Sequence, residues 1–503
     1  MTLTIDTARY GLLQTVIDEE SYARSVARFR DEQILLPTFS QLADPSTIPD
    51  EILKALLSID KDAPHPLNLF RVHWYNGIDR PDLVTVPEHI VLPSELTGVD
   101  AKIVLMFGNR FPMIGAHKVL AAYSCLVPRM VSGQFDPTVH RAVWPSTGNY
   151  ARGGVAISRL MHSRGVAVLP ENMSKERFDW LDAWVTDPED IIRTPGSESN
   201  VKEIYDACNR LAKDPSNFIL NQFNEFSNHV GHYAVTGRAL GHVFESMLGD
   251  DPGLELAAVI SASGSAGTLA MGDRLKDEYG AKIVAVEALE CPTMLYNGYG
   301  DHNIQGIGDK HIPLIHNVMN TDIVTAVSDE ATDGLNLVFT TDVGKAYLTD
   351  NLGVDPAIVD QLKHFGFSSI CNTIAAIKTA KQLGLGSNQV LISVATDGSE
   401  MYGSEKADHL AAHYSDGFRE ADAAAIVSRF LLGAGTDHIE ELDTAGRERI
   451  FNLGYFTWVE QQGVSLADFD ARRDRGFWDT LHGMTPAWDA MIDEFNAATG
   501  VRV

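Results

Sequence analysis

Two short segments of the chain carry residues whose types and spacing suit chemistry. In the first, the string GAHK (115–118) places Lys118 directly before the apolar run VLAA (119–122). Burial disfavours the charged form of a lysine, so an amine in such a setting has a lowered pKa and suits Schiff-base formation. A solvated surface lysine is the ordinary alternative, and this segment alone leaves both interpretations open.

The second segment is SASGSAGT (261–268), which follows the apolar run LAAVI (256–260) and leads into an amphipathic stretch. Small residues let a backbone approach an oxyanion closely, and the N–H groups and dipole of the following helix attract negative charge. The segment contains no Arg or Lys and matches neither the Walker A nor the GxGxxG pattern. It predicts an anion site built from backbone N–H groups, with a tight packing turn as the alternative.

The elements that position these segments form an alternating pattern between about residues 85 and 400. Candidate strands are 102–107, 141–144, 166–169, 218–220, 256–260, 282–287 and 390–395, and candidate helices between them include 150–164, 174–186, 200–212, 231–248, 267–279 and 369–383. Such succession predicts right-handed crossovers and an α/β fold with parallel sheets. The last hundred residues carry amphipathic stretches (419–432, 444–462, 485–497) and no convincing strand, which predicts a helical cap or an oligomer contact.

Composition excludes several classes of protein. The 503 residues carry 40 Lys+Arg against 68 Asp+Glu, a net charge of -28 that repels nucleic acid and anionic lipid. The N-terminus lacks the features of a secretory signal, and no apolar run is long enough for a membrane span. Cys125, Cys208, Cys291 and Cys371 are scattered without CxxC spacing, so we expect buried thiols in a cytoplasmic protein.

The two segments belong to a longer series of resemblances. GAHK is similar to the cofactor-lysine motif of the tryptophan synthase β subunit. Further segments resemble cysteine synthase and cystathionine β-synthase in the same order along the chain: WPSTGNYARGG (144–154), NQFNEFSNHVGHYAVTG (221–237), SASGSAGTLAMGD (261–273), HNIQGIGDKHIP (302–313), AVSDEA (326–331) and VLISVATDGSEMY (390–402). The sequence thus resembles the pyridoxal-phosphate (PLP)-dependent fold type II family over about residues 90–402.

This resemblance implies a two-lobed, tryptophan-synthase-β-like α/β core at 85–402, with a mobile small lobe at about 125–235. Residues 1–84 are then an N-terminal extension, and 403–503 a helical C-terminal region. Lys118 would hold pyridoxal 5'-phosphate as a Schiff base, and Asn149 would bond its phenolic oxygen. The phosphate would lie against Ser261, Ser263, Gly264, Ser265, Ala266, Gly267 and Thr268, and the substrate carboxylate against Ser146, Thr147, Gly148 and Gln222.

The residue that faces the pyridine nitrogen is ambiguous. Aligned on threonine synthase or the tryptophan synthase β subunit it is Thr396, which we favour, whereas the cysteine synthase motif places it at Gly398, beside Ser399. A neutral hydroxyl there favours loss of a β leaving group over transamination, but Asp397 between the candidates would reverse that preference. Tyr150 stands where the family usually has a smaller or polar residue.

The resemblance implies α,β-elimination or β-replacement on an amino acid with a β leaving group. A threonine-synthase-like β,γ-replacement and a non-catalytic, ligand-binding relative of the fold are the alternatives. A homodimer is implied, with a small-molecule amino-acid substrate and neither nucleic acid nor membrane as partner. No metal site is expected, because the i,i+4 pair His409 and His413, and the group His302, His311 and His316, lack the further ligands that such a site needs.

Overall fold

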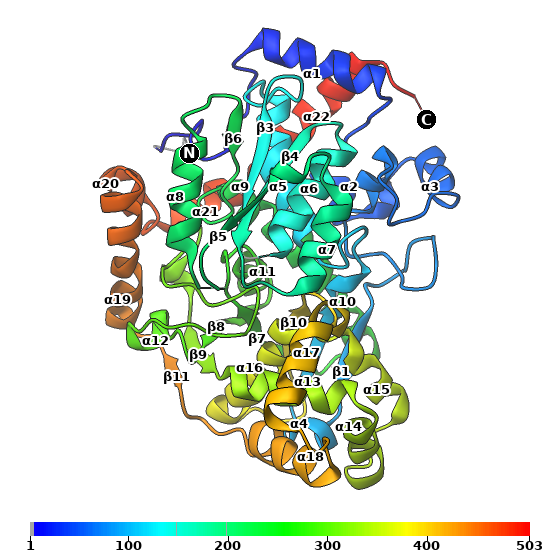
Figure 1. The fold of residues 1–503 in the computed structure, drawn as a ribbon, viewed down its shortest axis with the longest axis vertical. Coiled ribbons are helices and arrows are strands. Elements are labelled where there is room, and N and C mark those ends of the chain that lie inside the picture. The colour runs from blue at the N-terminus through cyan, green and yellow to red at the C-terminus, as the bar shows by residue number, and fades with distance from the viewer. Residues whose placement is uncertain (1–4, 147, 198, 503) are drawn as a thin grey trace.

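A computed structural model describes residues 5–146, 148–197 and 199–502. Two sheets form the framework (Figure 1). The large sheet has the strand order β1 (His89–Leu92), β2 (Lys102–Phe107), β10 (Gln389–Ala395), β7 (Glu255–Ala262), β8 (Lys282–Ala288), β9 (Ile323–Val327), β11 (Ile439–Glu441). The small sheet has the order β5 (Ile191–Thr194), β4 (Arg164–Pro170), β3 (Arg141–Pro145), β6 (Asn217–Ile219).

The interior strands run parallel to their neighbours, as their continuous apolar sequences predict. Strand β2 buries both faces: Val104 and Met106 belong to one hydrophobic cluster, and Ile103 and Leu105 to a second cluster on the other face. The two edge strands of the large sheet depart from the prediction of parallel strands: β1 pairs with β2, and β11 with β9, in antiparallel fashion. The expectation of no strand in the last hundred residues is therefore wrong at β11, which is too short to show periodicity.

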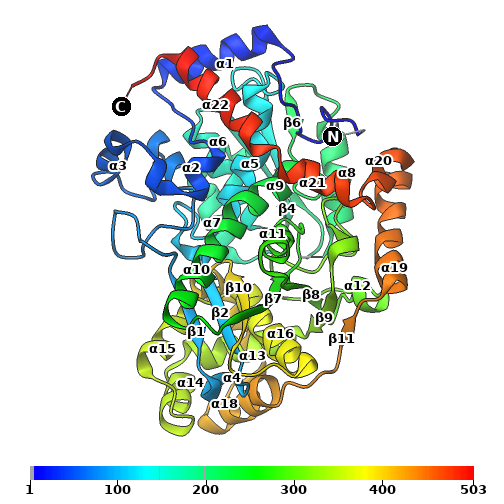
Figure 2. The same ribbon diagram turned by 180° about the vertical axis from the view of Figure 1, so that it is seen from behind.

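Helices cover both sheets (Figures 1 and 2). Those packed on the small sheet are α6 (Asn149–Leu160) and α8 (Val201–Leu211), whereas α11 (Leu269–Tyr279) and α16 (Phe367–Leu383) pack on the large sheet. The remaining helices of the two lobes are α4 (Ser94–Thr97), α5 (Lys118–Val131), α7 (Lys175–Trp184), α9 (Phe226–Gly231), α10 (Gly237–Asp250), α12 (Thr293–Tyr296), α13 (Asp329–Thr340), α14 (Asp342–Ala346) and α15 (Pro356–Gln361).

The two ends of the chain pack against each other beside the small sheet. Helices α1 (Glu19–Asp31) and α2 (Phe39–Ala43) contact α22 (Thr485–Thr499), while α3 (Asp50–Leu56) lies nearby (Figure 2). The rings of Phe29 and Phe495 are 5.1 Å apart, and those of Phe39 and Trp488 are 5.5 Å apart. The N-terminal extension is thus built into a core that the C-terminal helix completes.

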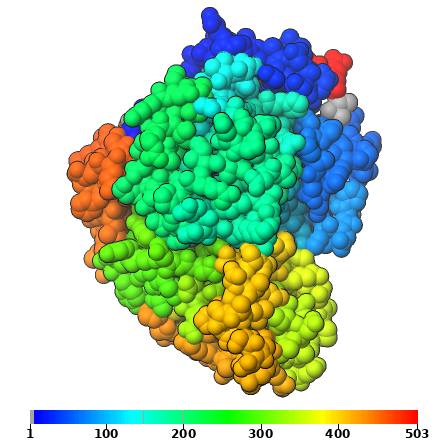
Figure 3. All heavy atoms as spheres, viewed as in Figure 1, coloured from blue at the N-terminus to red at the C-terminus, as the bar shows by residue number. Residues whose placement is uncertain are grey.

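The C-terminal residues pass over both lobes. Helices α17 (Gly403–His413) and α18 (Glu420–Val427) pack on α13 of the large lobe. After β11 the chain continues through α19 (Thr444–Tyr455), α20 (Leu466–Ala471) and α21 (Arg475–His482) before it reaches α22, as Figure 2 shows. Figure 3 shows the orange part of this path from outside, at one edge of the molecule. All four cysteines are buried free thiols. In the described residues, no helix is both long and apolar enough to cross a bilayer.

Candidate functional site

A cavity between the two lobes collects seven of the predicted site residues. Those that line it are Lys118, Ser146, Asn149, Gln222, Gly264, Ser265 and Thr396. Six further residues complete its wall: Tyr150, Phe223, Gln305, Gly306, Asp309 and Ser368. Thr396 directly follows β10, and the loop with Gly264 and Ser265 follows β7, so the cavity lies at the carboxyl ends of parallel strands, where α/β sheets bind ligands.

Lys118 is the first residue of α5, and its amine points across the cavity. The Nζ atom lies 3.2 Å from Oε1 of Gln222 and 3.3 Å from Oγ of Ser265. The preceding His117 is fully buried and stacks on Trp74 with ring centroids 5.7 Å apart. Burial holds the pKa of His117 well below its usual value, so this ring is neutral beside the lysine. The apolar run after Lys118 is buried, as the sequence predicted.

The loop between β7 and α11 presents its backbone to the cavity. From Gly264 to Thr268, no N–H group donates a hydrogen bond to any other residue that the structure describes. A Cβ on Gly264 would lie 2.4 Å from the carbonyl oxygen of Gly306, and one on Gly267 would lie 2.6 Å from Oδ1 of Asn228. Glycine is required at both positions because neighbouring groups leave no room for a side chain. Such consecutive, unused N–H groups at a helix start suit an anion.

Contacts within and around the same loop hold its shape. The hydroxyls of Ser261 and Thr268 bond each other across the loop at 2.9 Å. The backbone carbonyl of Ser263 accepts a bond from the backbone N–H of Gly308 at 2.9 Å, and Ala266 has the positive φ of 66° that a non-glycine residue rarely adopts. These contacts fix the loop before any ligand binds, which lowers the entropic cost of binding.

A second helix start faces the cavity at α6. Oγ of Ser146 accepts a bond from the N–H of Gly148 at 2.8 Å, and Gly148 has a φ of 148° with Arg177 packed where a Cβ would stand. Thr147 lies outside the described residues. The start of α6 thus offers a second site for an anion, such as a carboxylate.

Asn149 and Asp397 join the two lobes across the cavity. Nδ2 of Asn149 donates to Oδ2 of Asp397 at 2.7 Å, and the hydroxyl of Tyr402 donates to the same carboxylate oxygen at 3.0 Å. Arg177 adds an ion pair to Asp397 at 3.8 Å. The cavity beside these side chains has a volume of only about 20 Å³. A ligand larger than water therefore requires groups that line the cavity to move.

The two candidates for the pyridine nitrogen lie in different surroundings. Thr396 lines the cavity, whereas the hydroxyl of Ser399 donates to the carbonyl oxygen of Lys363 at 2.8 Å. Asp397 is turned toward Asn149 and Tyr402. The geometry therefore favours Thr396 among the residues proposed from the sequence.

Asp309 is the residue of this site that the sequence reasoning missed. It lines the cavity and is buried, and its Oδ2 atom has no hydrogen-bond partner among the described residues. Burial raises the pKa of this carboxyl from 3.8 to about 7, and the charge of Lys118 opposes the shift. The signal was present in the sequence: HNIQGIGDKHIP (302–313) resembles the segment HKIQGIGAGFIP of cysteine synthase and cystathionine β-synthase, and it has Asp309 where that segment has alanine.

Comparison with known proteins agrees with this arrangement. Residues 94–341 match the family described as pyridoxal-phosphate dependent enzyme, a segment that contains the lysine, the loop and the start of α6. This segment belongs to that family. The chain is 26% identical over 290 residues to a probable cysteine synthase from Bacillus subtilis, which covers 57% of this chain and 84% of the relative. It is 28% identical over 211 residues to cystathionine beta-synthase from Saccharomyces cerevisiae, which covers 40% of each.

Solved structures share the fold. The structure of cysteine synthase from Entamoeba histolytica superposes with a TM-score of 0.53 at 20% identity, covering 68% of this chain and 92% of that one. The protein is therefore a PLP-dependent enzyme of fold type II.

The residues present fit this cofactor. The unused N–H groups at Gly264–Thr268 suit its phosphate, and the amine of Lys118 suits its aldehyde. Asn149 and Thr396 line the same cavity and offer an amide and a hydroxyl to the ring substituents. No arginine or lysine side chain lies in the phosphate loop itself, so binding there depends on backbone groups.

Proposed function

We propose that this enzyme catalyses β-replacement or α,β-elimination on an amino acid that carries a leaving group at Cβ. The observation that supports the proposal most is the position of the Lys118 amine, within 3.3 Å of both Gln222 and Ser265, between the two anion-binding helix starts. That arrangement places a proton acceptor between the site for a phosphate and the site for a carboxylate. The names of the relatives point to the same reaction class.

When bound, pyridoxal phosphate supplies an aldehyde that reacts with an amine and a ring that draws electrons from the carbon atoms of the substrate. In the proposed reaction the amine of Lys118 would take the Cα proton of the substrate, and Gln222 and Ser265, which now bond this amine, would hold it in position. The loop at Gly264–Thr268 anchors the phosphate and so fixes the distance between the cofactor and Lys118.

The substrate carboxylate lies, in this proposal, at the start of α6, where Ser146 and the backbone N–H groups face the cavity. Thr396 would provide a neutral hydroxyl to the pyridine nitrogen of the cofactor. A neutral partner limits how strongly the cofactor ring draws electrons from the substrate. Closure of the small lobe by Asn149 and Asp397 would then exclude water during the reaction. The lobe at about 125–235 is accordingly proposed to open for substrate entry and product release.

A substrate panel tests the proposal. Purified enzyme is incubated with O-acetylserine, O-phosphoserine, cysteine and alanine, each with and without a thiol, while pyruvate, ammonia and thioether products are measured. We expect reaction with the β-substituted amino acids and negligible transamination of alanine. Rapid transamination of alanine, or no reaction with any β-substituted amino acid, would contradict the proposal.

Substitution of the lysine gives the matched test. Lys118→Ala is expected to lose at least about 10²- to 10⁴-fold in rate, because the proton acceptor is removed. Lys363→Ala, at a lysine whose side chain is 46% exposed, is the control and should keep full activity. The proposed homodimer is checked on the same preparations by light scattering coupled to size-exclusion chromatography.

A further inference from the structure

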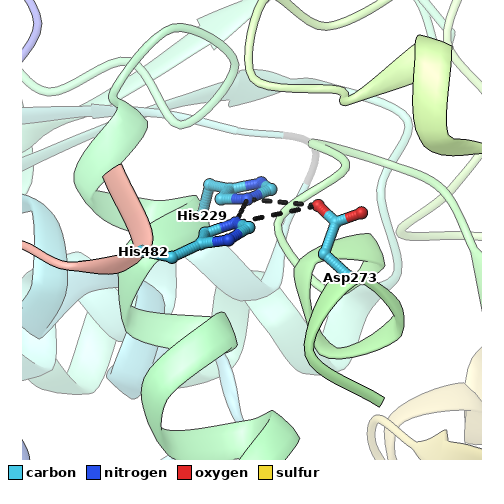
Figure 4. Close-up of side chains that lie close together, drawn as sticks. All are labelled: His229, Asp273 and His482. Carbon is cyan, nitrogen blue, oxygen red and sulfur yellow. Dashed lines mark hydrogen bonds and ion pairs between the residues drawn. The ribbon is translucent and has the colours of Figure 1, made fainter. Parts of the chain in front are cut away.

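Three ligand-type side chains meet in a buried cluster that the proposed reaction does not use (Figure 4). His229 lies on α9, Asp273 on α11, and His482 is the last residue of α21. Their side chains are 1%, 3% and 9% exposed, respectively. These residues are far apart in the sequence. They come together because α21, which belongs to the C-terminal region 403–503, packs against α9.

The ligand atoms of the cluster have the spacing of a metal site. Nε2 of His229 lies 3.0 Å from Nε2 of His482 and 3.4 Å from Oδ2 of Asp273, and the third side, from His482 to Asp273, is 4.0 Å. A circle through three points with these separations has a radius of about 2.1 Å, which is the Zn–N and Zn–O bond length. An ion about 0.5 Å above the plane of the three atoms would lie roughly 2.1–2.2 Å from each of them, with its opposite side open to a fourth ligand.

The second layer around the cluster holds the ligands in place. Nδ2 of Asn317 donates to Oδ2 of Asp273 at 3.2 Å, and Asn320 donates to the other oxygen. The ring of Tyr233 stacks on His482 with centroids 3.7 Å apart, and Trp478 lies 4.8 Å from His229. Hydrogen-bonded carboxylates and an apolar surround are the usual supports of protein metal ligands.

A surface pocket gives access to the cluster. It has a volume of about 200 Å³, and its wall contains the ligand His482 together with Asn317 and Asn320, which bond Asp273, so the pocket reaches the edge of the cluster. Neighbouring cations are paired: Arg475 lies 3.1 Å from Asp277, and Arg274 lies 2.8 Å from Glu278. The one carboxylate among the ligands therefore remains available to a cation.

We propose that His229, Asp273 and His482 bind one Zn²⁺ ion, with water as the fourth ligand. Two imidazoles and a carboxylate are a donor set that zinc accepts in tetrahedral sites. The ion joins α21 to α9, which follows the segment with Gln222, and to α11, which follows the phosphate loop. Its role is therefore structural, because it ties the C-terminal region to the elements that position the active site. The alternative is a metal-free hydrogen bond between the two imidazoles.

The test uses the full-length holoenzyme. Protein treated with a chelator and then freed of it is titrated with ZnCl₂ by calorimetry, and bound zinc is counted by elemental analysis after gel filtration. We expect one Zn²⁺ per chain and a rise of a few degrees in the unfolding temperature. A wild-type protein that retains no zinc and whose unfolding temperature is unchanged would overturn the proposal, leaving the imidazole hydrogen bond.

Two variants assign the ion to the cluster. His482→Gln should weaken zinc binding at least about 100-fold, because it removes one of three protein ligands. His409→Gln is the matched control, since His409 is also within 4.0 Å of a carboxylate and stands beside a second histidine, at a different place in the fold. Equal zinc binding in His482→Gln and wild type, or its loss in His409→Gln, would refute the assignment. The wild-type titration does not depend on how well either variant folds, nor on catalytic activity.

Discussion

Asp309 offers a direct check on the electrostatics of the cavity. Its pKa is raised from 3.8 to about 7 by burial, so the folded protein keeps this proton over a range of pH in which the unfolded chain has lost it. Unfolding then releases a proton, and stability falls as the pH rises. The contribution is fully present below pH 3.8 and is lost as the pH passes through about 7. Asp309→Asn removes this dependence while keeping the shape of the side chain.

The size of the effect follows from the two pKa values. Integrating the linkage relation between about pH 5 and about pH 8 gives a loss of about 2.5 kcal/mol for a carboxyl that titrates at about 7 when folded and at 3.8 when unfolded. Hydration of the ionised group reduces this figure, so about 1–2.5 kcal/mol is expected. Relative to wild type, Asp309→Asn should therefore become more stable by that amount as the pH rises.

Urea unfolding of the cofactor-free proteins at several pH values measures the difference. Other buried acids, among them Asp273 and Glu287, also have raised pKa values, so only the comparison of variant with wild type isolates Asp309. Asp416→Asn, at an exposed aspartate, is the control and should follow wild type at every pH. Parallel pH profiles for wild type and Asp309→Asn would show that this carboxyl is not held protonated in the cavity.

Three further substitutions test the site and its support. Gly264→Ala should weaken cofactor binding at least tenfold, because the new Cβ would stand 2.4 Å from the Gly306 carbonyl. Gly249→Ala, with open space around it, is the control, and cofactor binding of both variants is measured by fluorescence titration. Thr396→Val should lower turnover and Ser399→Ala should not, since the Ser399 hydroxyl bonds Lys363; equal losses in steady-state rate would contradict this. Trp488→Ala should cost about 3–5 kcal/mol of unfolding free energy, whereas exposed Phe456→Ala should cost little.

The interior of the fold was predictable because its strands carry continuous apolar runs. Strand β2 coincides with its prediction, and β7, β8 and β10 extend theirs by at most three residues at either end. Four strands of the described residues were missed: β1, β5, β9 and β11. Of these, β1 and β11 are short antiparallel edge strands, and pairing with a distant neighbour, not their own periodicity, makes them strands. β5 is a four-residue edge strand of the small sheet, whereas β9 is an interior strand whose apolar run IVTAV was overlooked. β11 in particular exists because β9 is available to pair with it.

The site was predictable to the extent that its chemistry depends on local sequence. The phosphate loop needs small residues in consecutive positions, and the lysine needs an apolar helix after it, so both leave signals in short segments. The bond from Asn149 to Asp397 leaves none, because it depends on how two lobes approach each other. The same holds for the cluster of His229, Asp273 and His482, which only the C-terminal path assembles.

The terminal segments reach the active site through the residues that follow Gln222. Phe226 packs between Tyr10 of the N-terminal extension, at 5.6 Å, and Trp478 of α21, at 5.9 Å. The adjacent Glu225 forms a buried ion pair with Arg129 at 2.6 Å, and Arg129 also donates to the backbone of the N-terminal extension. Both ends of the chain therefore confine the segment whose amide holds the Lys118 amine. The terminal segments are thus part of the support of the lysine that we propose to be catalytic.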